Sequence, residues 1–522
     1  MVPRWHSPGG SIASGERNSA VMVAGKISVP KKWANLLRLQ ESGVASKVEL
    51  AELEFVGDEN AEGSFESAPM EMRSMWARAS SLGESWRSGN LEPSIDRVTR
   101  EKERIRTLRS ELRERPKQPL MWSELARSQM IIGRDEDASR SMACAIHLAP
   151  ENVYLRRCAS RMHLHLDDHD SALSVIRKHP AAKHDPRLVS AEIAVSSVAK
   201  RPSKYAHLAR GLVDEERYRA QHRSEVAAAI GTVELESGRH RKARDLFQKS
   251  LESPSENTLA QVQWASERDS KIIIPSAAWE TPCSHEAEAM ASRARHDWNS
   301  VLDCCELWLD SEPFASKPAH LGSFASFRTD FAERAHRIAT NGLLVNKENT
   351  LLLNNRAVSS AYLGRIDEAI IDIKSAIKAG AASDAHMAAT MGLIAYRSGL
   401  PDLGEQYYGT AVAKFLADKN VDSILLASLY WIREMARYDP GRARLDFDYV
   451  KKTSYKLLGG RRDPEVESML EVIEAEIGQE VLVSVPFMLD NRGEISSVFD
   501  SFSIGRNVVA IRSRLLEEML KN

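Results

Sequence analysis

Long apolar runs and paired cysteines are missing from this chain of 522 residues. No stretch approaches eighteen consecutive apolar residues, so a membrane-spanning helix is not expected. The first thirty residues contain no hydrophobic core of a signal peptide. The five cysteines form no CxxC pair, a usage typical of reduced, intracellular proteins. We therefore expect a cytoplasmic protein with no membrane partner.

Familiar catalytic and cofactor motifs are absent as well. The sequence contains no GxxxxGK[ST], no GxSxG, no HExxH and no GxGxxG opening a helix. Its 71 basic and 73 acidic residues give a formal net charge of −2, so no strong overall field attracts nucleic acid. We expect no enzyme activity, no cofactor, no metal and no nucleic-acid partner.

What the chain does have is a 34-residue period. Small residues recur at the eighth place of each block (Ala126, Gly231, Ala289, Ala357, Gly392) and at the twentieth place (Ala138, Ala172, Ala243, Ala335, Ala369). These places belong to two helices that cross closely, with a glycine turn between them. The period therefore predicts antiparallel helical hairpins over 119–152, 153–186, 224–257, 282–315, 316–349, 350–383 and 385–418.

The offsets of these hairpins resemble the tetratricopeptide repeat (TPR) family. In the first block the resemblance is carried by Trp122, Leu125, Ala126, Gly133, Ala138, Ala145 and Pro150. A single hairpin cannot bury its own apolar face, so the hairpins must stack. The resemblance implies an all-α solenoid that serves as a protein-binding scaffold or adaptor.

Five segments follow from the phasing. Pro202 should break the hairpin over 187–223, and the run from Ile272 to Pro275 should end any helix there. We expect a mostly disordered N-terminal segment with short helices and an acidic linker (1–70), a first stack (71–257), an irregular hinge (258–281), a second stack (282–478) and a C-terminal segment (479–522).

The C-terminal segment has a different pattern. Residues 481–489 are apolar and partly β-branched, 490–493 read as a turn and 495–499 form a second short run. We expect a β-hairpin with Pro486 on an edge strand, followed by an amphipathic helix over 506–520. This segment also offers a surface for a homo-oligomer.

One cluster invites an enzymatic interpretation. Residues 163–170, His-Leu-His-Leu-Asp-Asp-His-Asp, nearly spell the HxHxDH pattern of metallo-β-lactamase-like hydrolases. Asp168 stands where that pattern has a histidine, and the stretch spans the end of one helix and the turn of the second repeat. We interpret it as a core histidine, His163, followed by a solvated turn.

The stacked first helices should form the groove in which a partner lies. In TPR proteins this groove is lined by the second, fifth, ninth, twelfth and thirteenth places of the first helix, and aromatic or cationic side chains there suit an extended peptide or a partner helix. The predicted protein-binding residues are His320, Phe324, Phe327, Arg328, Asn354, Asn355, Tyr362, Tyr396 and Arg397. The competing interpretation places about half of them in the core between repeats.

A narrower resemblance is incomplete. Asn355 looks like the asparagine of the carboxylate-clamp TPRs, which bind chaperone C-terminal tails, but His320 and Phe324 stand where the clamp has lysine and asparagine. The following repeat offers His386 and Thr390 where the clamp has lysine and arginine. Without those cations a free carboxylate loses its charge-assisted hydrogen bonds. We do not predict binding of chaperone tails.

Two functions remain open at this point. The first is a non-catalytic scaffold that binds a protein partner in its groove. An overall likeness to subunits of bacterial conflict or defence assemblies, which no motif carries, suggests that the chain belongs to such an assembly. The second is a regulatory or sensor protein whose terminal segments contact nucleic acid or carry an unrecognised activity. A stable protein partner would favour the scaffold.

Overall fold

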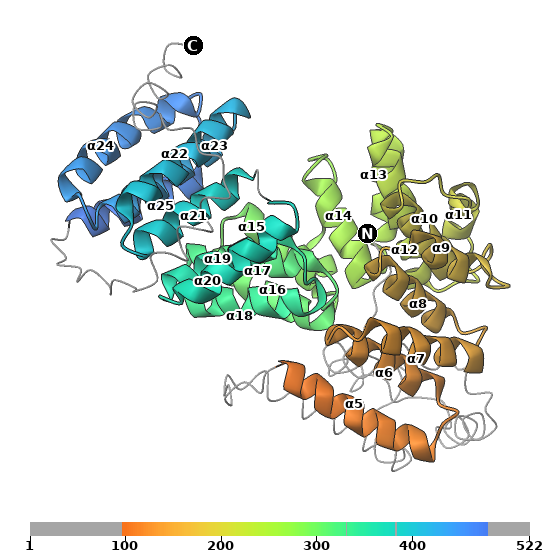
Figure 1. Ribbon diagram of the computed structural model, residues 1–522. Helices are drawn as coiled ribbons and strands as arrows, with labels where there is room; N and C mark the ends of the chain where they lie inside the picture. The colour runs from red at the N-terminus through yellow and green to blue at the C-terminus, as the bar shows by residue number, and fades with distance from the viewer. Residues whose placement is uncertain (1–96, 330, 382–383, 479–522) are drawn as a thin grey trace, which may run out of the picture. The chain divides into compact units, whose positions relative to one another are not determined.

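The protein is helical wherever its structure is described. The structure is a computed structural model, and it describes residues 97–329, 331–381 and 384–478. Every regular element within these ranges is a helix (Figure 1). None of those helices is long and apolar enough to cross a bilayer. The predicted helices before residue 97 and the predicted hairpin and helix of 479–522 lie outside the described residues.

The chain forms two compact units, Met1–Pro318 and Ala319–Asn522, which we call unit 1 and unit 2. The described helices of unit 1 are α5 (Arg97–Glu114), α6 (Pro119–Ile131), α7 (Asp135–Leu148), α8 (Val153–His165), α9 (His169–Arg177), α10 (Pro186–Val198), α11 (Ala206–Val213), α12 (Ala220–Glu236), α13 (His240–Ser250), α14 (Glu256–Ser266), the short 3₁₀ helix η4 (Ser276–Glu280), α15 (His285–Ala294) and α16 (Trp298–Ser311).

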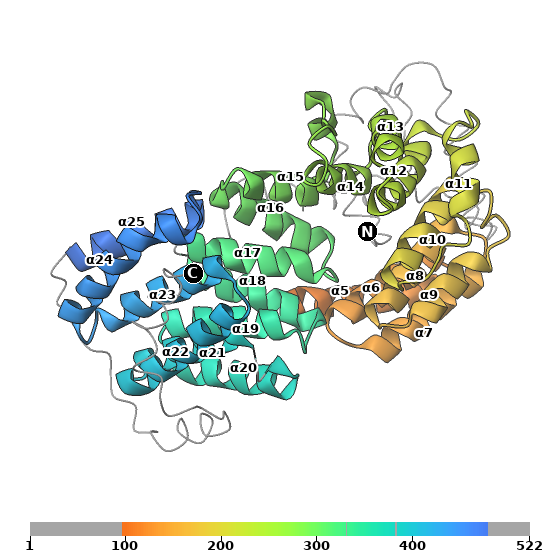
Figure 2. The same cartoon turned by 90° about the horizontal axis from the view of Figure 1, so that it is seen from above.

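Unit 2 begins within the first turn of α17 (Ser316–Arg328). Its other described helices are α18 (Ala332–Val345), α19 (Thr350–Tyr362), α20 (Ile366–Lys378), α21 (Ala385–Arg397), α22 (Pro401–Ala417), α23 (Val421–Met435), α24 (Pro440–Leu457) and α25 (Pro464–Gly478). Consecutive helices pair as antiparallel hairpins that follow one another along the unit (Figure 2). We call the first helix of each hairpin its A helix and the second its B helix.

The 34-residue period is confirmed as a series of helical hairpins. Each predicted block contains two helices and one turn: α6 with α7, α8 with α9, α12 with α13, α15 with α16, α17 with α18, α19 with α20, and α21 with α22. The break expected at Pro202 is present too, because it lies in the seven residues between α10 and α11.

Small residues form the crossings of the hairpins, as predicted. The alanines at the eighth and twentieth places are buried, and Ala126, Ala357 and Ala369 expose nothing to solvent. A Cβ atom added to Gly392 would lie 2.6 Å from Cδ2 of Tyr408 on the partner helix. No side chain fits there without moving that ring. Size at these places therefore sets the distance between the paired helices.

The fifteenth place turns the chain in every block where this residue is described. The backbone there adopts a left-handed conformation, with positive φ angles at Gly133, Asp167, Gly238, His296, Gly364 and Gly399. Glycine adopts this conformation without strain, whereas other L-residues pay a steric cost. Asp167, in the middle of the histidine- and aspartate-rich stretch, therefore occupies an ordinary turn position of the second hairpin.

The boundary between the units differs from the predicted hinge at 258–281. That segment contains most of α14, and its irregular part packs on neighbouring helices. Ile272 joins the buried cluster around Phe247, and Ala278 packs with Leu259 and Ala287. Because apolar side chains tie this segment to helices on both sides of it, α15 and α16 continue unit 1.

Candidate protein-binding surface

The A helices of unit 2 lie in a row and are joined to one another by side chains. Asn355 on α19 donates to Ser323 on α17, with 2.8 Å from Nδ2 to Oγ. Tyr362 on α19 lies beneath the guanidinium of Arg397 on α21. Each pair is about one repeat apart, because corresponding parts of adjacent hairpins face each other. We call α17, α19, α21, α23 and α25 the A-helix row.

The first two helices of the row, α17 and α19, are also joined through His320. Nε2 of His320 lies 2.8 Å from Oδ1 of Asn349, an amide oxygen that also caps α19 by accepting from the N–H of Leu352. Since that oxygen can only accept, His320 donates from Nε2. Burial lowers the pKa of His320, although its bond to Asn349 acts in the opposite direction. The imidazole is therefore a neutral donor at pH 7.

An aromatic and cationic cluster occupies the middle of the row. The ring centroids of Phe327 and Tyr362 are 6.4 Å apart. Arg397 lies 4.7 Å from the centroid of Tyr362, and Arg433 of α23 lies 5.7 Å from it. Burial raises the pKa of the Tyr362 phenol, and the nearby carboxylate of Glu434 raises it further. Tyr362 is thus a neutral ring with two guanidinium groups within 6 Å of its centroid, a favourable cation–π arrangement.

Arg397 is held by a buried ion pair. Its Nε and Nη2 atoms each donate to a carboxylate oxygen of Glu434 at 2.7 Å. The Arg397 side chain is 12% exposed and that of Glu434 only 1%. A bidentate pair of this kind fixes the guanidinium in one orientation. Its main role is to join α21 to α23.

Two of the predicted groove residues belong to the core. Tyr396 is 2% exposed, and its hydroxyl accepts a hydrogen bond from Nε1 of Trp431 at 2.9 Å. Asn354 is also buried, and its Oδ1 accepts from the hydroxyl of Thr390 at 2.8 Å. A partner could not contact either side chain without opening the stack. We therefore leave Tyr396 and Asn354 out of the candidate surface.

The other predicted residues whose side chains are described lie on the row with part of their surface exposed. Phe324 and Phe327 are half-buried on α17, and so are His320, Asn355 and Tyr362. The side chain of Arg328 is not among those described. The candidate surface therefore consists of His320, Phe324, Phe327, Asn355, Tyr362 and the paired Arg397.

The sequence did not indicate the next part of the row. Arg433 and Glu434 of α23 complete the cluster around Tyr362, and Arg433 pairs with Glu476 of α25, with 2.8 Å from Nε to Oε2. The period is lost after residue 418, so the spacing does not assign Arg433 or Glu434 to a groove place. The nearest usable signal was the apolar pattern of 421–435, which indicates a helix but not which side chains face α21.

The histidine- and aspartate-rich stretch forms a helix end and a cap. Asp168 is the N-cap of α9, and its carboxylate accepts from the backbone N–H of Ser171 at 3.0 Å. Asp170 pairs with Arg201, and His165 packs its ring against Phe314. Within the described ranges, no group of three or more His, Cys, Asp and Glu side chains is placed to hold a metal ion.

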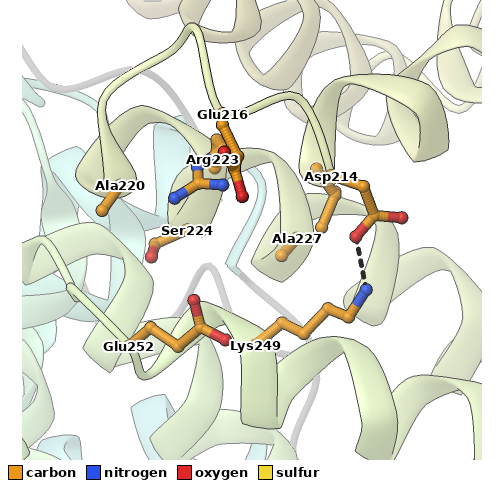
Figure 3. A pocket seen from close by; sticks show the side chains of 9 residues that line it. Asp214, Glu216, Ala220, Arg223, Ser224, Ala227, Lys249 and Glu252 are labelled. Atoms are coloured by element: carbon orange, nitrogen blue, oxygen red, sulfur yellow. Dashed lines mark hydrogen bonds and ion pairs between the residues drawn. The ribbon is translucent and has the colours of Figure 1, made fainter.

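A small cavity lies elsewhere, in unit 1, where α12 meets the ends of α11 and α13 (Figure 3). Its volume is about 210 Å³. Asp214 and Lys249 form an ion pair at 2.5 Å across one side, and Glu216, Arg223 and Glu252 add charges of both signs. These charges largely neutralise one another, so the lining selects neither an anion nor a cation.

Comparisons with known proteins establish no family. The chain matches no protein-family model and no curated protein. Among solved structures it is similar to a chain from the crystal structure of the APC/C hetero-tetramer Cut9-Hcn1, with a TM-score of 0.35 and 13% sequence identity over 85% of this chain and 95% of that chain. A TM-score of this size carries no conclusion about function.

Proposed function

We propose that the chain is a non-catalytic scaffold of the TPR type that binds a protein or peptide partner along the A-helix row of unit 2. The observation that supports this proposal most directly is the set of half-buried aromatic rings on successive A helices, above all Phe327 beside Tyr362. Rings of this kind provide large contact areas while losing little side-chain entropy on binding.

Polar groups beside these rings can form hydrogen bonds with the backbone of a partner segment in extended or helical form. Asn355 has a second amide N–H beyond the one that it donates to Ser323, and the neutral His320 ring, whose one N–H goes to Asn349, offers an acceptor nitrogen. The contacts to Asn349 and Ser323 hold both side chains in place before a partner arrives. Preorganised donors cost less entropy on association than flexible ones. Specificity on such a surface would come from a few aromatic anchors surrounded by oriented polar groups.

The wider setting of this function follows from the sequence. We infer a cytoplasmic location from the cysteine usage, and membership of a bacterial conflict or defence assembly from the overall likeness noted above. We also infer from the sequence that residues 479–522 provide a surface for homo-oligomerisation. Identification of the partner tests the assembly directly.

The experiment begins with affinity capture on the full chain and identification of the bound protein. Binding of the purified partner is then measured for Phe324→Ala and Phe327→Ala. Each change should weaken binding by ~1–3 kcal/mol, because truncation of a buried interface anchor has this effect. Circular dichroism of each variant checks that its helices remain.

Tyr455→Ala is the matched control. Tyr455 is an aromatic residue on the B helix α24 and is 60% exposed, so its loss should change partner binding by less than ~0.5 kcal/mol. If binding survives both phenylalanine changes and is lost when 479–522 is deleted, the C-terminal segment is the recognition element. The row would then be purely structural.

A further inference from the structure

Unit 1 contains three buried arginines, two of which are at equivalent places of the repeat. Arg127 on α6 and Arg161 on α8 occupy the ninth place of two consecutive 34-residue blocks, a place that faces the groove in TPR proteins. Arg97 on α5 is the third, and we call these residues the arginine row. Each of the three residues is 7% exposed or less. Buried guanidinium groups require partners of matching charge or geometry.

These partners come from the far end of the unit. Nη2 of Arg97 donates to the carbonyl oxygen of Leu309 at 3.1 Å, and the same atom lies 3.6 Å from the carboxylate of Asp310. Nη2 of Arg127 lies 3.3 Å from the carbonyl oxygen of Ser311 and 3.5 Å from that of Asp310. About 180 to 210 residues separate the two sides of this contact.

The accepting carbonyls belong to the last turn of α16. Carbonyls at the end of a helix have no intrahelical donor and carry the negative end of the helix dipole. Cationic donors from α5 and α6 therefore satisfy the orphan acceptors of Leu309, Asp310 and Ser311. The arginine row recognises the C-terminal end of a helix.

An aromatic anchor follows the helix end. Phe314, four residues after Asp310, is 5% exposed. The guanidinium carbon of Arg161 lies 5.7 Å from its ring centroid, and the His165 ring lies 5.5 Å from it at an angle of 52°. The bound segment, 309–314, thus combines helix-end carbonyls, an acidic side chain and a buried phenylalanine. This combination is that of a peptide held by an anchor and oriented donors.

We propose that Arg97, Arg127 and Arg161 form a second peptide-binding surface, occupied by the chain's own 309–314 segment until an acidic, phenylalanine-containing peptide of a partner replaces it. This surface is separate from the A-helix row of unit 2 and does not depend on the function proposed for that row. While 309–314 is bound, α5 and α6 remain joined to the end of α16 and the arginine row is closed.

The affinity of the arginine row for a free peptide depends on competition with the internal 309–314 segment. A tethered ligand acts at an effective concentration of about millimolar. A free peptide that makes the same contacts must compete with that concentration, so wild-type protein should bind it weakly. Weakening the internal segment should reveal the site.

The test uses the full chain and a fluorescent peptide with the sequence of residues 306–317. The variant Asp310→Asn/Phe314→Ala removes the carboxylate beside Arg97 and the aromatic anchor, and it changes the internal segment only. We expect it to bind the peptide at least about tenfold more tightly than wild type does, because competition from the tether is weakened. Adding Arg127→Ala and Arg161→Ala to this variant should abolish the gain.

Two controls make the result specific. Leu307→Ala changes an exposed residue of α16 and should leave peptide binding at the wild-type level. A peptide with alanine in place of Phe314 should not bind the opened variant. Equal peptide affinity of wild type and the opened variant would overturn the proposal, as would binding that persists without the two arginines.

A second measurement covers the case in which the opened variant unfolds. Hydrogen exchange of wild-type protein is recorded with and without peptide at several millimolar, about the effective concentration of the tether. Displacement should accelerate exchange of the amides in 309–315 several-fold while the middle of α12 stays protected. Unchanged exchange at this peptide concentration would count against a replaceable segment.

Discussion

Replacing Arg397 by alanine tests whether this residue is a structural member of the stack. The change removes two hydrogen bonds of 2.7 Å and leaves the Glu434 carboxylate, which is 1% exposed, without its main counter-charge. Loss of one partner of a buried ion pair costs ~3–5 kcal/mol, since the remaining charge stays desolvated. Arg437 remains 3.6 Å from the same carboxylate, so we expect the low end, about 3 kcal/mol.

The loss should appear as a lower melting temperature. For a unit of 150 to 250 residues, ~1 kcal/mol corresponds to about 2–4 °C, so the helical signal of unit 2 should melt about 6–12 °C earlier. Circular dichroism during heating measures this shift, and urea titration gives the free energy of unfolding. Arg397→Ala is therefore unsuitable as a binding variant, because a loss of association would reflect loss of the fold.

Arg461→Ala is the matched control for this measurement. Arg461 pairs with Asp422, but the two side chains are 55% and 43% exposed, and exposed pairs contribute only ~0–1 kcal/mol. The double variant Arg397→Ala/Glu434→Gln should be more stable than Arg397→Ala alone, because it also removes the buried charge. Equal effects of Arg397→Ala and Arg461→Ala, or no recovery in the double variant, would refute the role of the pair.

Two further predictions concern the repeat and its caps. Gly392→Ala should lower the free energy of unfolding by ~1–3 kcal/mol in a thermal melt, because the new Cβ would lie 2.6 Å from a Tyr408 ring that is itself stacked on Trp431. Gly441→Ala is the control: a Cβ there has its nearest neighbour 3.7 Å away, so the loss of unfolding free energy should be only a small fraction of that of Gly392→Ala. Asp384→Ala should cost ~1 kcal/mol at pH 7, because Asp384 caps α21 by accepting from the N–H groups of His386 and Met387. The pKa of Asp384 is lowered to about 2, first by its hydrogen bond with the His386 side chain and further by the two backbone N–H groups, so its folded pKa lies below its unfolded one. The stabilisation is present above pH ~4 and is lost as the pH falls toward 2, and melts over this range should show Asp384→Ala and wild type converging; a constant difference down to pH 2 would contradict the cap.

The sequence alone determined the repeating unit. The helical period, the small residues at the crossings and the residues of the turns all act within one hairpin, so they can be located by their spacing. Ala126, Ala357 and Ala369 are buried at the crossings, and Gly133, Gly238 and Gly364 have positive φ angles in the turns. The spacing also placed Phe327 and Tyr362 on neighbouring A helices.

The tertiary structure decided which groove positions are available. Tyr396 and Arg397 are adjacent in sequence and both fall on groove places, but their exposure depends on α23, where Trp431 bonds to one and Glu434 to the other. The region after 418 has no readable phase, so the sequence does not show which side chains meet there. Burial at these places depends on the neighbouring hairpin as well as on the hairpin itself.

The closure of unit 1 also appears only in the folded chain. The period shows that Arg127 and Arg161 are equivalent, yet nothing in their spacing points to a segment about 150 to 180 residues away. That contact depends on the small rotation that each hairpin adds to the one before, accumulated over the whole unit. Local sequence determines each hairpin, whereas the summed geometry of the stack decides that α16 ends against the arginine row.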